Sequence, residues 1–162
     1  MKTVFTIMIS ICLLSTVKAQ TKVEISDFET LNNTNWKGTL MYVNYSDGKE
    51  VTLQTTMRIE LKKNKVITEI KFPGEPKANS TTKIKLRKKG TFFGDEKILK
   101  KENLENETLK ITTFYKGNDN GKKAKMYKTY LFNKDTFVIT KEVEYIGSKD
   151  RFIRNKQSYK RI

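Results

Sequence analysis

The sequence predicts an all-β protein whose strands form an antiparallel meander of about eight to ten strands, closed into an up-and-down barrel. Two observations predict this fold. From residue 36 to the end, segments of about 8 to 12 residues alternate with turn-rich breaks. Within these segments apolar residues recur with period two, the pattern of a strand with one buried and one solvated face, and no helical segment separates them.

The alternation is clearest between residues 50 and 62. One face of this segment is polar and carries Thr52, Gln54, Arg58 and Lys62. The opposite face is predicted to point into the core and carries Val51, Leu53, Thr55, Met57, Ile59 and Leu61.

The same pattern divides the rest of the chain into strands and turns. The breaks at 46–49 and 118–121 suit tight hairpins, and the loop at 73–76 contains both prolines of the chain. The least regular part is 94–108, where short strands are favoured over a helical turn. The predicted strands are 36–45, 50–62, 65–72, 81–89, 91–100, 107–116, 124–133, 135–146 and 151–161.

These short connections decide how the sheet is arranged. Each strand is expected to pair with the next one along the chain, because no break is long enough to demand a crossover. A meander of nine strands must then close or leave exposed edges that invite self-association. We therefore expect a barrel, with a β-sandwich as the alternative.

The N-terminus has the features of a cleavable secretory signal. Lys2 precedes the apolar run from Val4 to Leu14, and small residues lead up to Ala19. The run is shorter than the roughly 20 residues that a membrane-spanning helix needs. We expect a signal peptide at 1–19, an arm or short helix at 20–35 and the barrel domain at 36–162, with an extracytoplasmic location, secreted or periplasmic.

The chain is strongly basic. It has 33 Lys and Arg residues against 18 Asp and Glu, a net charge of +15. Loss of Lys2 and Lys18 with the signal would leave +13. This charge favours contact with an anionic surface or partner, but lysines spread along the whole chain are also typical of a solvated surface.

The residue types that are absent exclude several kinds of chemistry. The chain has no histidine, and its one cysteine, Cys12, lies inside the predicted signal. A zinc site, a histidine-ligated haem and Ser-His or Cys-His catalysis are therefore excluded, and we expect no metal, no cofactor and no catalytic residues. The remaining enzymatic alternative is a glycosidase-like pair of carboxylates, although the aspartates fall in predicted turns, as at Asp119.

The segment 35–40, Asn-Trp-Lys-Gly-Thr-Leu, opens the first strand with Trp36 beside Gly38, and the chain ends with basic residues at Arg154 and Arg161. This arrangement resembles the calycins, the group that contains lipocalins and fatty-acid-binding proteins. The resemblance implies a lipocalin-like barrel in which Trp36 closes one end and Arg154 or Arg161 packs over its ring. A guanidinium over an indole is stabilising by about 0.5–2 kcal/mol.

The predicted function follows from this barrel. We expect a small hydrophobic or amphipathic ligand in the interior, and the alternative is a packed basic domain that binds anionic surfaces or partners. The tyrosines are favoured for ligand contact because a buried hydroxyl needs a hydrogen-bond partner. The candidate ligand-binding residues are Trp36, Tyr42, Met57, Phe72, Tyr115, Tyr130, Phe137 and Tyr145.

Two other classes of protein share parts of this pattern. The stretches 110–116 and 125–132 interleave lysines with aromatic residues, as single-stranded nucleic-acid binders do. Export argues against that partner, and a half-buried strand with a lysine-rich outer face explains the pattern, so no nucleic acid is expected. An outer-membrane barrel is disfavoured because the strands lack aromatic girdles at both ends. We expect a protein that does not span a membrane.

Overall fold

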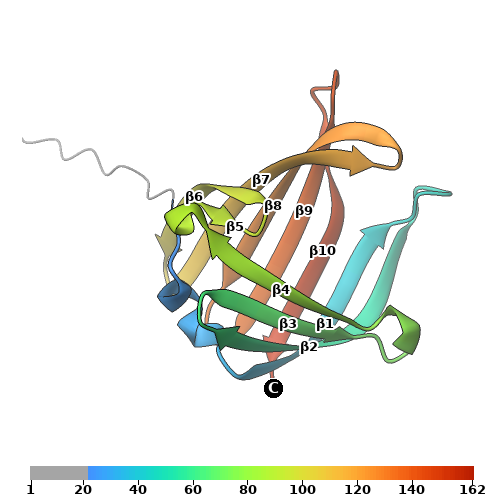
Figure 1. Ribbon diagram of the computed structural model, residues 1–162. Coiled ribbons are helices and arrows are strands. Elements are labelled where there is room, and N and C mark those ends of the chain that lie inside the picture. The colour runs from blue at the N-terminus through green and yellow to red at the C-terminus, as the bar shows by residue number, and fades with distance from the viewer. Residues whose placement is uncertain (1–21) are drawn as a thin grey trace, which may run out of the picture.

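The computed structural model describes residues 22–162, and the predicted signal at 1–19 lies outside them. Its strands form one closed antiparallel barrel in the order β1-β10-β9-β8-β7-β6-β5-β4-β3-β2 (Figure 1). Each strand pairs with its neighbour in sequence, and β1 pairs with β10. This confirms the predicted fold class and excludes the sandwich. The strands are β1 Thr34–Val43, β2 Glu50–Lys62, β3 Lys65–Lys71, β4 Ser80–Arg87, β5 Phe92–Phe93, β6 Glu96–Leu104, β7 Thr108–Asp119, β8 Lys122–Phe132, β9 Thr136–Tyr145 and β10 Arg151–Arg161.

Three short 3-10 helices accompany the strands. They are η1 Ile25–Leu31, η2 Pro76–Ala78 and η3 Lys88–Gly90. Among residues 22–162, no helix has the length and apolar character needed to cross a membrane. Figure 1 shows η1 at one end of the barrel, below called the helix end. The hairpin loops after β1, β7 and β9 lie at the other, the hairpin end.

The predicted strand at 91–100 is in fact two strands. Gly94 has a φ of +64°, a backbone conformation that favours glycine, and it turns the chain between β5 and β6. A register shift between Ile98 and Lys100 then interrupts the pairing of β6 with β7. The turn and the irregularity together explain why the alternation fades in this region.

The barrel closes where the first strand meets the last. Trp36 opposes Arg161 and Gly38 opposes Tyr159 in the β1–β10 register. A Cβ atom on Gly38 would lie 2.0 Å from the carbonyl oxygen of Ser158. Glycine is therefore required at this position, because the two strands approach too closely for any side chain.

The N-terminal segment covers the helix end. The backbone N–H of Val23 donates to the carbonyl of Gly90 at 2.9 Å. From η1, Phe28 stacks on Phe93 and Phe132, with ring centroids 5.2 and 5.7 Å apart, and Leu31 is fully buried. These contacts make η1 the floor of the barrel interior.

The buried apolar residues form two separate groups. The larger group fills the helix end around Phe28, Trp36 and Ile111. The smaller group consists of Ala124, Met126 and Val143. Because the two groups do not merge, the barrel interior is not one continuous apolar core.

Candidate functional site

A cavity of about 330 Å³ lies inside the barrel. This volume is at the lower end of the range typical of small-molecule sites. Most of its lining is apolar, and part of it comes from η1. The apolar lining residues are Phe28, Leu31, Met57, Val66, Ile70, Ile84, Phe93, Phe137 and Ile139.

One side of the cavity is polar. Six side chains from β7, β8, β9 and β10 line it: Tyr115, Lys128, Tyr130, Lys141, Asn155 and Gln157. The cavity therefore presents an apolar floor and a cationic, hydrogen-bonding wall. Such a surface suits an amphipathic molecule better than a wholly apolar one.

A groove of about 750 Å³ joins the cavity from the side of the barrel. The groove and the cavity share Thr82, Ile84, Phe93, Tyr115 and Lys128. The groove exists because the sheet is incompletely paired at this point. The strand β4 pairs with the two-residue strand β5 only at Leu86 and Arg87. Apart from a hydrogen bond from Gly94 N–H to the carbonyl of Lys85, the rest of β4 is paired on its β3 side alone within the described residues, which leaves an opening toward β7.

Glu96 is the centre of a polar cluster next to this wall. Its carboxylate forms an ion pair with Lys128 and accepts hydrogen bonds from Thr113 Oγ1 at 2.7 Å and Tyr130 Oη at 2.9 Å. Burial raises the pKa of Tyr130 well above its usual value, and that of Tyr115 to about 12, with Glu96 contributing to both. Both phenols are therefore neutral hydrogen-bond donors at neutral pH.

The positive charge of Lys141 has a more distant carboxylate partner than the charge of Lys128. The two lysines are directly opposite each other in the β8–β9 register. The nearest carboxylate oxygen to Lys141 Nζ is Asp119 Oδ1, at 3.7 Å. Burial lowers the pKa of Lys141, Asp119 partly offsets this, and the nearby charges of Lys128 and Arg154 lower it further.

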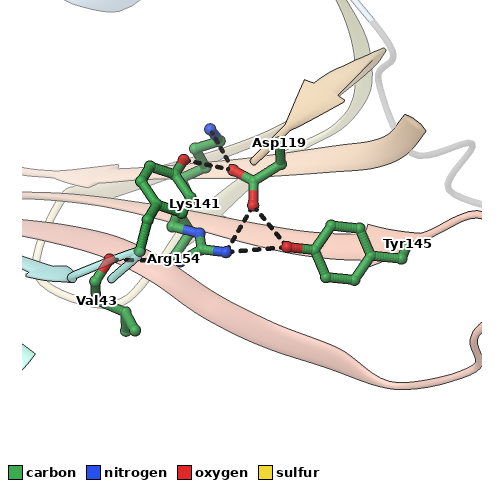
Figure 2. A network of polar contacts seen from close by, with 6 residues as sticks. Val43, Asp119, Lys141, Tyr145 and Arg154 are labelled. Atoms are coloured by element: carbon green, nitrogen blue, oxygen red, sulfur yellow. Dashed lines mark hydrogen bonds and ion pairs between the residues drawn. The ribbon is translucent and has the colours of Figure 1, made fainter. Parts of the chain in front are cut away.

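A second polar network lies toward the hairpin end (Figure 2). Arg154 Nη2 is 2.6 Å from Asp119 Oδ2 and 3.1 Å from Tyr145 Oη, and Arg154 Nη1 donates to the carbonyl of Val43 at 3.3 Å. Asp119 also accepts hydrogen bonds from Tyr45 at 2.9 Å and Tyr145 at 3.1 Å. Both members of the ion pair are buried, and the network links β7, β9 and β10 to the segment that follows β1.

The network sets the ionisation of Asp119. Burial alone would raise the pKa of this carboxyl group, but hydrogen bonds from Tyr45, Arg154 and Tyr145 outweigh it. The pKa of Asp119 therefore lies below its usual value. The sequence predicts Asp119 in a turn, and this is wrong. Asp119 is the last residue of β7, and it is buried.

The structure brings four of the eight candidate ligand-binding residues to the cavity: Met57, Tyr115, Tyr130 and Phe137. Met57 and Phe137 contribute to its apolar part. Tyr115 and Tyr130 are the two candidate tyrosines that line the cavity, and the hydroxyl of Tyr130 donates to Glu96.

The other four candidates lie outside the cavity lining. Trp36 is fully buried in the helix-end core, where its ring meets Phe137 edge-on at 6.2 Å. Tyr145 belongs to the Asp119 network. Tyr42 is half-buried near the end of β1, and Phe72 follows the end of β3.

The expected closure of one end by Trp36 and a C-terminal arginine takes a different form. Because β1 and β10 are antiparallel, Arg154 falls beside Val43 at the hairpin end, far from Trp36. Its guanidinium lies 4.3 Å from the ring centroid of Tyr45 instead. Arg161 does oppose Trp36 in register, but it is exposed and donates to the carbonyl of Lys134 at 3.4 Å.

Sequence reasoning missed the charged wall of the cavity. The stretch 125–132, which contains Lys128, is predicted to carry a lysine-rich outer face, and no role is predicted for Lys141. Each of these lysines nevertheless lies an even number of residues from a side chain that lines the cavity. Lys128 is two residues from Tyr130, and Lys141 is two residues from Ile139. Strict application of the period-two rule would have placed both lysines inside.

The cavity is lined by apolar, hydroxyl, amide and ammonium side chains. Residues 22–162 contain no group of three or more metal-ligating side chains. Comparison with models of protein families found no family that matches the chain, and comparison with curated proteins found no matching relative.

Proposed function

We propose that this protein is an extracytoplasmic, lipocalin-like binding protein that holds a small amphipathic molecule in its barrel. The observation that carries the proposal is the cavity of about 330 Å³, with its apolar floor and polar wall. A closed ten-strand antiparallel barrel is compatible with a lipocalin-like protein. Export is supported by the signal-like pattern at 1–19.

The position of the cavity adds support. Phe28 and Leu31 of η1 line it at the helix end, Lys141, which lies 3.7 Å from Asp119, lines its polar side, and the groove beside β4 offers an entrance. An unfilled cavity reduces stability because its lining loses packing contacts. A domain that acted only through its outer surface would lose this stability without any functional advantage.

The proposal assigns no catalytic activity to the interior. Glu96 is held in an ion pair with Lys128, and Asp119 in one with Arg154. The lowered pKa of Asp119 keeps it ionised at neutral pH and unsuited to act as an acid. A binding role uses these groups as they stand.

The test uses N-phenyl-1-naphthylamine, a neutral probe whose fluorescence rises in apolar surroundings. Ile70 and Ile67 lie on the same strand, β3, but only Ile70 lines the cavity. We expect saturable uptake by the natural protein, loss of uptake in Ile70→Trp, and retention in the matched control Ile67→Trp. Absence of saturable uptake, or equal loss in both variants, would contradict the proposal.

A complementary measurement is native mass spectrometry of the protein purified from its own host, followed by organic extraction. A stoichiometric amphipathic molecule that co-purifies would support the proposal and give the ligand class. A clean unliganded mass, together with no uptake of the neutral probe, would overturn it.

A basic interaction module is the second candidate, favoured by one feature of the outer surface. Lys62, Lys63, Lys65 and Lys83 surround a shallow groove over β2, β3 and β4 that also contains Glu60 and Glu69. Sedimentation with vesicles of phosphatidylglycerol and phosphatidylcholine tests this candidate. Binding that a Lys65→Glu and Lys83→Glu double variant abolishes would support it, whereas no binding at physiological salt would exclude it.

A further inference from the structure

The charges inside the barrel do not balance. Three cations, Lys128, Lys141 and Arg154, face two carboxylates, Glu96 and Asp119, around the polar wall and the network beside it. The other interior ion pair, Lys101 with Asp27, lies at the helix end and is balanced. The excess is one positive charge.

Both carboxylates are already occupied. Glu96 holds Lys128 and accepts hydrogen bonds from Thr113 and Tyr130. Asp119 holds Arg154 at 2.6 Å and accepts hydrogen bonds from Tyr45 and Tyr145.

Of the three cations, Lys141 is therefore the one whose charge is least neutralised by a carboxylate. Its distance to Asp119 is 3.7 Å, longer than a charge-assisted hydrogen bond. Its side chain is only 18% exposed, so water compensates it poorly.

The register of the sheet makes the buried charge of Lys141 still less favourable. Lys128 and Lys141 are cross-strand partners on the inner face of β8 and β9. Like charges directly opposite each other on one face of an antiparallel pair are destabilising. On the other side of Lys141, its partner in β10 is Asn155, which is neutral.

We infer that the ligand is a monoanionic amphiphile whose carboxylate binds Lys141, with its apolar body extending toward η1. This inference rests on the proposed function and specifies its ligand. One carboxylate would neutralise the excess charge and provide the hydrogen-bonding partner that Lys141 lacks. Tyr115, Asn155 and Gln157 line the same wall and can donate to the second carboxylate oxygen. The apolar body would then contact Phe28, Leu31 and Phe93 on the floor.

The test compares two ligands with the same ten-carbon chain, decanoate and decanol, by isothermal titration calorimetry on delipidated protein at neutral pH. We expect decanoate to bind about tenfold or more tightly than decanol, the advantage of one charge-assisted hydrogen bond. If neither ligand binds and the neutral naphthylamine probe is also not taken up, the proposed function itself fails. If decanol binds as well as decanoate, only the inference about the carboxylate fails.

Matched variants locate the effect. Lys141→Met should remove the preference for decanoate and leave decanol binding nearly unchanged. The control is Lys156→Met, which deletes the same charge from an exposed position on β10, next to Asn155. Retention of the preference in Lys141→Met, or its equal loss in Lys156→Met, would show that the general surface charge attracts the anion and would overturn the inference. Circular dichroism confirms that each variant is folded, and the comparison of the two ligands on the natural protein stands even if a variant is not.

Discussion

Arg154 and Asp119 form a buried ion pair between β10 and β7, two strands that are separated in the barrel by β8 and β9. The pair therefore crosses the interior and connects elements that the sheet does not join directly. A register shift between Ile153 and Asn155 accompanies this arrangement on β10.

Loss of the Asp119 carboxylate should be strongly destabilising, because it leaves Arg154 buried without its counter-charge. We expect Asp119→Ala to lower the free energy of unfolding by about 3–5 kcal/mol, measured by urea denaturation. Asp150→Ala, an exposed loop position, is the control and should change stability by less than about 0.5 kcal/mol. Similar effects of the two substitutions would show that the network does not stabilise the barrel.

The pH dependence of stability should report the same pair. The pKa of Asp119 is lower in the folded protein than in the unfolded chain, so the unfolded state binds more protons between the two values. The resulting stabilisation is fully present above the unfolded value, about 4, and is lost as pH falls through the folded value.

We therefore expect the melting temperature of the natural protein to fall more steeply below about pH 4 than that of Asp119→Asn. Glu102 and Glu144, whose pKa values are also lowered, are present in both proteins and do not affect the difference. Parallel curves would contradict a contribution from Asp119.

Lys141 should reduce the stability of the ligand-free protein. Its lowered pKa means that the folded state disfavours the charged form. We expect Lys141→Met to raise the melting temperature of delipidated protein by about 2–4 °C, equivalent to about 1 kcal/mol for a domain of this size. Differential scanning calorimetry measures this shift, and Lys156→Met should show little change. A lower melting temperature for Lys141→Met would indicate a structural role for this lysine.

Gly90 should be essential for attachment of the N-terminal segment. Its φ is +84°, and a Cβ atom there would lie 2.1 Å from the carbonyl oxygen of Val23. We expect Gly90→Ala to release residues 22–31, which limited proteolysis would detect. Gly48→Ala is the control, because Gly48 also has a positive φ, +71°, but has no atom within 4 Å of the added Cβ. Equal cleavage in both variants would mean that backbone strain alone is responsible.

Much of the fold could be predicted from local pattern. The inner face proposed for 50–62 is correct, since Thr55, Met57 and Ile59 are all buried. This segment is regular because each of its residues pairs with a neighbouring strand without a bulge. The split of 91–100 into β5 and β6 was missed because a two-residue strand leaves no detectable alternation.

The site was less accessible to sequence reasoning, for two physical reasons. Lysine is rarely buried, so the lysines of 125–132, Lys128 among them, are predicted on the outer face and Lys141 is not predicted as a cavity residue. Arg154 lies at the register shift in β10, where the alternation changes phase. Its partner Asp119 is 35 residues away along the chain, and nothing local to either residue indicates that they meet.

The short join between β4 and β5 has a kinetic consequence. Two residue pairs join these strands, Leu86 with Phe93 and Arg87 with Phe92, and they are supported by a hydrogen bond from Gly94 N–H to the Lys85 carbonyl and by the exposed ion pair of Arg87 with Asp95. Local opening of this join would widen the groove beside β4 while the long strand pairings elsewhere in the barrel remain intact. The residence time of a bound molecule can then be set by how often this join opens, independently of how tightly the cavity holds the molecule.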